Sequence, residues 1–76
     1  MTYEDFELGK LVFIHPEDIY CNYHPNFKNK VGELVECDWV NSTFEVHFPE
    51  LGISMVLFPK RLITAEEYIN LYVNLK

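Results

Sequence analysis

The sequence predicts a mainly β domain, in which five strands form a small closed barrel and a C-terminal α-helix follows. Residues 43–48 alternate apolar and polar side chains without a break, which is typical of a strand with one buried face. Residues 31–63 carry this strand and its neighbours with almost no linker between them. A chain of 76 residues has room for one modest core. We therefore expect a single domain over residues 1–76, with the barrel over residues 10–63 and the helix over residues 65–75.

The other four strands are predicted where apolar runs are bounded by turn residues: 11–15, 31–39, 53–58 and 62–63. The run at 53–58 is apolar almost throughout, so we expect it to be covered on both faces. Residues 16–30 contain two prolines, three asparagines and scattered aromatics, which predicts a long surface loop. Residues 1–9 are expected to form a short amphipathic turn that packs back on the barrel.

The C-terminal helix is predicted to begin after Thr64, because Thr64 and Glu67 have the spacing of a capping box. One stripe of this helix should face the barrel, and it consists of Ala65, Ile69, Tyr72 and Val73. Further apolar residues lie partly off this stripe: Tyr68, Leu71, Tyr72 and Leu75. The sequence favours a helix wedged between the barrel and the N-terminal segment, and leaves open a homodimer or partner contact through the helix.

Charge and composition exclude several classes of function. Twelve carboxylates against six Lys and Arg give a formal net charge of −6, which disfavours binding to nucleic acid. The sequence has neither a basic, apolar leader nor a stretch long enough to span a membrane, so we expect a cytoplasmic protein without a membrane partner. Cys21 and Cys37 match no redox motif and are expected to be free thiols.

No motif for catalysis, a cofactor or a metal is present. The chain has no nucleophile elbow and no phosphate-binding loop, which argues against an enzyme. A zinc site would have to draw on scattered ligands, namely His15, Cys21, His24, Cys37 and His47. Structural zinc usually uses two close ligand pairs, and here only Cys21 and His24 form one. We therefore expect no metal and no cofactor.

Two stretches resemble known small barrels. Residues 30–36, Lys-Val-Gly-Glu-Leu-Val-Glu, resemble the glycine-led strand of KOW-type and photosystem-I-subunit-E-type barrels. Residues 57–63, Leu-Phe-Pro-Lys-Arg-Leu-Ile, are similar to the Phe-Pro-x-x-Tyr-Val turn of Src-homology-3 domains. The resemblance implies a five-stranded Src-homology-3-like barrel. It does not imply recognition of proline-rich peptides, because Leu62 replaces the turn tyrosine and residues 11–15 lack the usual paired tyrosines.

Aromatic side chains in the long loop supply the candidate binding face. We expect an exposed patch formed by these residues and the neighbouring hairpin: Tyr20, Tyr23, His24, Phe27, Asp38 and Trp39. Tyr and Trp are enriched at protein interfaces. The resulting hypothesis is a non-catalytic protein-binding module that acts as an accessory subunit, adaptor or inhibitor, in a sharper form a small acidic phage or mobile-element antagonist of a host protein.

The alternative hypothesis is a KOW-type nucleic-acid or ribosome-associated barrel. It would use a local basic patch made of Lys28, Lys30, Lys60 and Arg61. Phosphate contacts would give such binding a steep dependence on salt.

Overall fold

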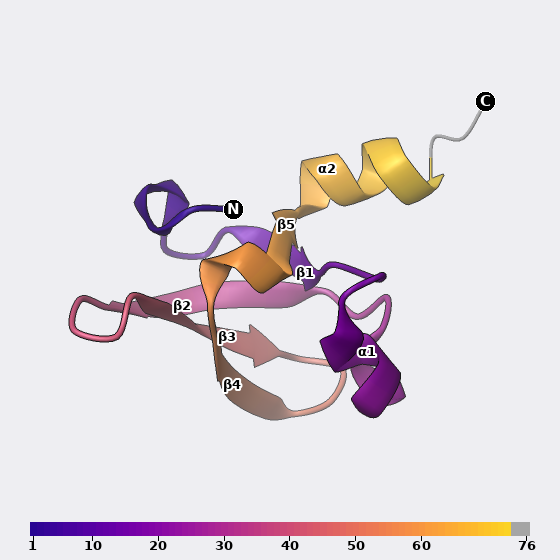
Figure 1. Ribbon diagram of the computed structural model, residues 1–76, viewed down its shortest axis with the longest axis horizontal. Coiled ribbons are helices and arrows are strands. Elements are labelled where there is room, and N and C mark those ends of the chain that lie inside the picture. Colours follow the sequence, from indigo (N-terminus) through magenta and orange to yellow (C-terminus); the bar gives the residue numbers. More distant parts are fainter. Residues whose placement is uncertain (74–76) are drawn as a thin grey trace.

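The structure of the protein, a computed structural model, describes residues 1–73 (Figure 1). Five antiparallel strands form one sheet: β1 (Leu11–Ile14), β2 (Gly32–Asp38), β3 (Thr43–Phe48), β4 (Ile53–Leu57) and β5 (Leu62–Thr64). The 3-10 helix η1 (Tyr3–Asp5) precedes the first strand. The helices α1 (Ile19–Tyr23) and η2 (Pro25–Phe27) lie between β1 and β2, and η3 (Pro59–Arg61) lies between β4 and β5. The C-terminal helix α2 (Ala65–Tyr68) continues as the π-helical segment η4 (Ile69–Val73). The predicted mainly β class with a C-terminal helix is confirmed.

The sheet is open. Its strand order is β4-β3-β2-β1-β5, and β4 and β5, its two edges, do not pair with each other among the described residues. The closed barrel that the sequence predicts is therefore not confirmed. The short η3 turn connects the two edge strands, and Leu57 and Leu62 on either side of it are both buried in the core. The sheet thus curls around a common core without closing by hydrogen bonds.

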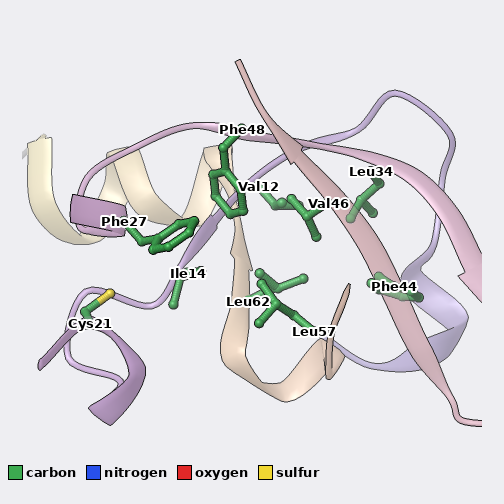
Figure 2. Close-up of a cluster of buried hydrophobic side chains, with 10 residues drawn as sticks. All are labelled: Val12, Ile14, Cys21, Phe27, Leu34, Phe44, Val46, Phe48, Leu57 and Leu62. Atoms are coloured by element: carbon green, nitrogen blue, oxygen red, sulfur yellow. The ribbon is translucent and has the colours of Figure 1, made fainter. Parts of the chain in front are cut away.

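Strand β3 supplies the centre of that core. Its alternating residues Phe44, Val46 and Phe48 are fully buried, as the pattern predicts, and they pack with Leu34 and Leu57. Figure 2 shows ten buried side chains from the sheet and from the segment that follows β1, converging between the strands. The apolar face of one regular strand thus organises a core to which elements along most of the chain contribute.

Strand β2 contains a β-bulge that alternation does not predict. Leu34 pairs with Val46, but the next paired residue is Glu36, which lies opposite Glu45, so that Val35 is the extra residue. A bulge of this kind changes which face the following side chains point to. Leu34 is buried and Cys37 packs against the core, whereas Glu36 is exposed.

Two expectations about the strands and loops are wrong. Strand β4 is an edge strand rather than a strand covered on both faces, and its Ile53 and Val56 side chains are 41% and 64% exposed. Residues 16–30 are not an irregular loop, because they contain α1 and η2. The α1 helix begins where the Asp18 carboxylate accepts a hydrogen bond from the Tyr20 amide at 2.8 Å.

The face that the C-terminal helix turns inward agrees with the predicted stripe at Ala65 and Tyr72 but not at Ile69 and Val73. Tyr68 stacks on Phe13 of β1 with ring centroids 3.9 Å apart, whereas Ile69 and Val73 are 45% and 61% exposed. Tyr72 also points inward, with its hydroxyl 3.4 Å from His15 Nδ1. The inward face is therefore formed by Ala65, Tyr68 and Tyr72, whose spacing of i, i+3 and i+7 is that of one helix face. The predicted contribution of Leu75 lies outside the described residues.

The helix is not wedged under the N-terminal segment. Figure 1 shows α2 and η4 leading away from the sheet on one side, and η1 on the other. The helix start is as predicted: the Thr64 hydroxyl accepts a hydrogen bond from the Glu67 amide at 3.1 Å, and the Thr64 amide donates to the Glu67 carboxylate at 3.2 Å.

Replacing Phe44 by Ala should lower the free energy of unfolding by roughly 3–5 kcal/mol, because it empties the centre of a well-packed core. Urea unfolding followed by far-ultraviolet circular dichroism measures the loss. The matched control is Leu8→Ala, since Leu8 is 74% exposed and its truncation should change stability by no more than about 0.5 kcal/mol. Equal losses in the two variants would contradict the core assignment.

Thr64→Ala should lower the free energy of unfolding by about 1 kcal/mol, because the Glu67 amide loses its acceptor. Thr64→Ser keeps the hydroxyl and should retain most of that stability. Thermal unfolding of both variants checks the cap, and a loss of the same size in Thr64→Ser would show that the hydroxyl is not what stabilises the helix start.

Candidate functional site

The hairpin that joins β2 and β3 is held by Asp38. One carboxylate oxygen accepts hydrogen bonds from the Val40 amide at 2.8 Å and the Asn41 amide at 3.2 Å, and the other accepts from the Asn41 side chain at 2.9 Å. The Asn41 side chain, followed by the two backbone amides, holds the pKa of Asp38 below its usual range. Asp38 therefore fixes the turn, a role that the sequence reading, which placed it in an aromatic patch, did not foresee.

This turn presents two large apolar side chains to solvent. Trp39 is 82% exposed and Val40 is 90% exposed. The Trp39 ring is not isolated, since it contacts the edge of the Tyr3 ring with centroids 5.6 Å apart. The hairpin and the N-terminal segment thus form one continuous surface.

The N-terminal segment is fixed on the core beside the hairpin. Its amino group donates a hydrogen bond to the Leu62 carbonyl at 3.0 Å, and the Tyr3 and Phe6 rings pack on Phe44 with centroids 5.7 and 5.3 Å away. The Tyr3 hydroxyl is buried and has no hydrogen-bond partner among residues 1–73. Burial, and then the neighbouring Cys37 thiol, which does not reach hydrogen-bond geometry, raise the pKa of Tyr3 to about 12.

An open apolar groove lies between the N-terminal segment and the η3 turn. Its volume is about 250 Å³, and it is lined by Met1, Thr2, Tyr3, Ser42, Phe58, Pro59 and Lys60. The Phe58 side chain is 50% exposed, with the Lys60 ammonium 5.9 Å from its ring centroid. Because Tyr3 lines the groove and contacts Trp39, the groove and the hairpin tip together form an apolar surface, called here the hairpin-end surface.

Sequence reasoning missed the groove residues Met1, Tyr3 and Phe58. It predicted that residues 1–9 only pack against the barrel, and it placed Phe58 inside a strand. The available signal was the Phe58-Pro59 pair, because a residue before proline tends to leave the regular ladder in an extended conformation. That signal marks the end of a strand, and it says nothing about the distant N-terminal segment that completes the groove.

The predicted loop aromatics are divided between core and surface. Phe27 is only 4% exposed and packs edge-on against Phe48 at 5.0 Å, so its placement in an exposed patch is wrong. Tyr20 is half-buried, and burial raises the pKa of its hydroxyl. Tyr23, which is 74% exposed, and His24 do face solvent.

The loop aromatics and Trp39 do not meet. Figure 1 shows the β2–β3 turn at the far left of the molecule and α1 on the right, beyond the other end of the strands. The patch that the sequence predicts from Tyr20, Tyr23, His24 and Trp39 is therefore two separate surfaces. Their separation follows from the sheet, because the two segments leave opposite ends of β2.

The residues considered for zinc are also dispersed. The buried Cys21 thiol lies 3.7 Å from the His15 carbonyl, and its burial raises the thiol pKa. His47 lies on the outer face beside Ser54, at 3.1 Å, and Cys37 lies near Tyr3. Within residues 1–73, no group of three or more His, Cys, Asp or Glu side chains is placed to hold a metal ion.

The bases named for the alternative hypothesis are partly engaged with carboxylates. Arg61 donates to Asp18 at 2.7 Å, which ties η3 to the start of α1, and Lys30 lies 3.8 Å from Glu50. Lys60 lies over Phe58.

Comparisons with known proteins add no assignment. No protein-family model, curated protein or solved structure matches the chain. In the part of the chain that the structure describes, none of the helices combines the length and the apolar character needed to cross a membrane.

Trp39→Ala should lower the free energy of unfolding by about 1 kcal/mol or less, because the mutation removes one aromatic edge contact of a largely exposed ring. Urea unfolding measures the change. Since Trp39 is the only tryptophan, acrylamide should quench the fluorescence of the folded protein nearly as well as that of the unfolded chain. A loss of roughly 3 kcal/mol or more would show instead that Trp39 belongs to the core.

Proposed function

We propose that this chain is a non-catalytic protein-binding module, which acts as an accessory subunit, adaptor or inhibitor and engages its partner through the hairpin-end surface. The observation that carries the proposal is the continuity of that surface. The exposed Trp39 and Val40 lie on the hairpin tip, Trp39 contacts the Tyr3 ring, and Tyr3 and Phe58 both line the groove, where Lys60 is the one charged side chain among the described lining residues. Contiguous apolar surface of this kind typically marks an interaction site.

The chemistry of this surface suits a protein partner. Trp and Tyr bury a large area with few rotatable bonds, and aromatic anchors carry much of the energy at protein interfaces. The groove can accept one apolar side chain of the partner between Tyr3 and Phe58. The net charge of −6 favours a partner with a basic surface, because complementary charge speeds the encounter of two proteins.

The opposite end of the molecule is less suited to this role. Phe27 is buried there, Tyr20 is half-buried, and Asp18 is occupied by its ion pair with Arg61. Exposed apolar residues remain at this end, namely Ile19 and Tyr23, and they provide the comparison in the experiment below.

The finer assignment of the fold belongs to the same proposal. We infer that the curled sheet is an open form of the Src-homology-3-like barrel that residues 30–36 and 57–63 resemble. Support comes from the pairing of the first and last strands, β1 with β5, and from the shared core of the two edge strands. The nucleic-acid alternative draws less support, because Arg61 and Lys30 are both paired with carboxylates.

Phe58→Ala and Trp39→Ala should weaken binding to the partner by about 2 kcal/mol each, roughly thirtyfold in Kd, because each removes a central aromatic. The partner is first captured from a lysate with the tagged wild-type protein, identified and purified. Its Kd for each variant is then measured by isothermal titration calorimetry.

The matched control is Tyr23→Ala, which truncates an aromatic side chain of similar exposure at the opposite end. It should bind like the wild type. If Tyr23→Ala loses affinity while the two hairpin-end variants keep it, the binding surface is the α1 end and the proposal is wrong. If the captured ligand is RNA or DNA and its Kd depends steeply on salt, the nucleic-acid alternative replaces it.

A further inference from the structure

A second pocket, with acidic residues in its lining, lies on the outer face of the sheet. Its volume is about 90 Å³, and it is lined by Glu36, Cys37, Asp38, Thr43, Glu45 and Val56. These residues come from β2, β3 and β4 next to the hairpin turn. Three of the six carry carboxylates, and no basic residue lines the pocket.

The β-bulge at Val35 brings two of these carboxylates together. Glu36 lies directly opposite Glu45 in the β2–β3 register, with Val56 next in line on β4. Like charges opposite each other on neighbouring strands destabilise a sheet. The arrangement is therefore unfavourable for the free protein and becomes favourable when a positive group lies between the two carboxylates.

The third carboxylate is fixed at the rim. Asp38 accepts three hydrogen bonds from the hairpin turn, and these bonds keep its pKa low, so it stays ionised. A carboxylate has about four acceptor positions, so one remains for a donor outside the turn.

Thr43 is the observation that points to a missing ligand. This side chain is 6% exposed, and its hydroxyl is buried without a hydrogen-bond partner among residues 1–73. Thr43 alternates with the inward-pointing Phe44 and so shares the outer face with Glu45, where it lines the pocket. Buried hydroxyls are nearly always hydrogen-bonded, and this one has a free acceptor next to three carboxylates.

A cation that carries several hydrogen-bond donors would satisfy these carboxylates and the Thr43 hydroxyl together. No set of three such ligands in residues 1–73 lies close enough for a metal. A guanidinium is planar and has five N–H donors in a fixed fork, whereas an ammonium is a compact point charge. The Val56 side chain, 64% exposed, provides an apolar edge for the methylene stem of such a side chain.

We propose that this pocket binds the guanidinium of an arginine side chain, presented by the partner protein. This inference rests on the proposed function, because the partner that covers the hairpin-end surface would supply the arginine. The two sites adjoin along the chain, since Thr43 of the pocket directly follows Ser42 of the groove. The guanidinium donates to the carboxylates of Glu36 and Glu45 and to the Thr43 hydroxyl.

The experiment uses the free protein and needs no partner. N-acetyl-arginine amide is titrated into the ¹⁵N-labelled protein at constant ionic strength, and the backbone amide shifts of Thr43 and Glu45 are followed. The neutral analogue N-acetyl-citrulline amide, N-acetyl-lysine amide and calcium chloride are titrated in parallel. We expect saturable shifts with the arginine probe, weaker ones with the lysine probe, and none with citrulline or calcium.

The variants are Glu45→Gln and Thr43→Val, with Glu33→Gln as the control. Glu33 is on the same face of β2 as Glu36 but pairs with His47, and Glu33→Gln changes the net charge by the same amount as Glu45→Gln. The two pocket variants should raise the Kd of the arginine probe about threefold or more, and the control should not. Glu45→Gln should also move the urea midpoint of the free protein upward, because it removes the repulsion with Glu36.

Equal binding of the arginine and lysine probes, equal loss in Glu33→Gln, or tighter binding of calcium would overturn the proposal. These outcomes are independent of the groove variants. If the pocket binds the arginine probe but Phe58→Ala keeps the wild-type affinity for the partner, only the proposed function is contradicted. If Phe58→Ala loses affinity for the partner but the pocket does not bind the arginine probe, only this inference is contradicted.

Discussion

The single extra residue in β2, Val35, determines what the hairpin end of the molecule presents. Strand β3 alternates without interruption and fixes the core through Phe44 and its neighbours. Because the bulge shifts the pairing by one, Cys37 packs on the core side while Glu36 and Asp38 stay outside. Without it, Glu36 would follow Leu34 onto the buried face, where an unpaired carboxylate is costly. The bulge therefore keeps the acidic side chains of β2 on the outer face and out of the apolar core.

The two ends of the molecule differ in how many of their side chains have contacts or hydrogen-bond partners within the protein. At the α1 end, Asp18 caps the helix and pairs with Arg61, and Phe27 fills the core. At the hairpin end, Trp39 is open to solvent and the Thr43 hydroxyl lacks a partner among the described residues. Apolar and polar groups without partners on adjoining surfaces are typical of a binding site, and they support the proposal that a partner binds at the hairpin end.

The sequence predicts features that depend on local periodicity, and it does not predict how segments far apart in the chain are placed relative to one another. The alternation of β3 and the Thr64 cap were predictable, since each is encoded within a few residues. The bulge was not, because nothing in the run around Val35 distinguishes an extra residue from a paired one. Trp39 is far from the loop aromatics because residues 16–30 precede β2 and the hairpin turn follows it, so the two segments lie at opposite ends of this strand. The helix face was misassigned because more than one stripe of this helix is apolar, and the contact of Tyr68 with Phe13 of β1, which selects the inward face, is a long-range one.

The register across the bulge is the most direct test of this account, because the acidic pocket, the inward Cys37 and the exposed hairpin all depend on it. Nuclear Overhauser effects between backbone protons of β2 and β3 report that register in the labelled protein. The account predicts cross-strand contacts that join Glu36 to Glu45 and Leu34 to Val46. A contact that joins Val35 to Glu45 in place of Glu36 would contradict the account, because Glu36 would then face the core.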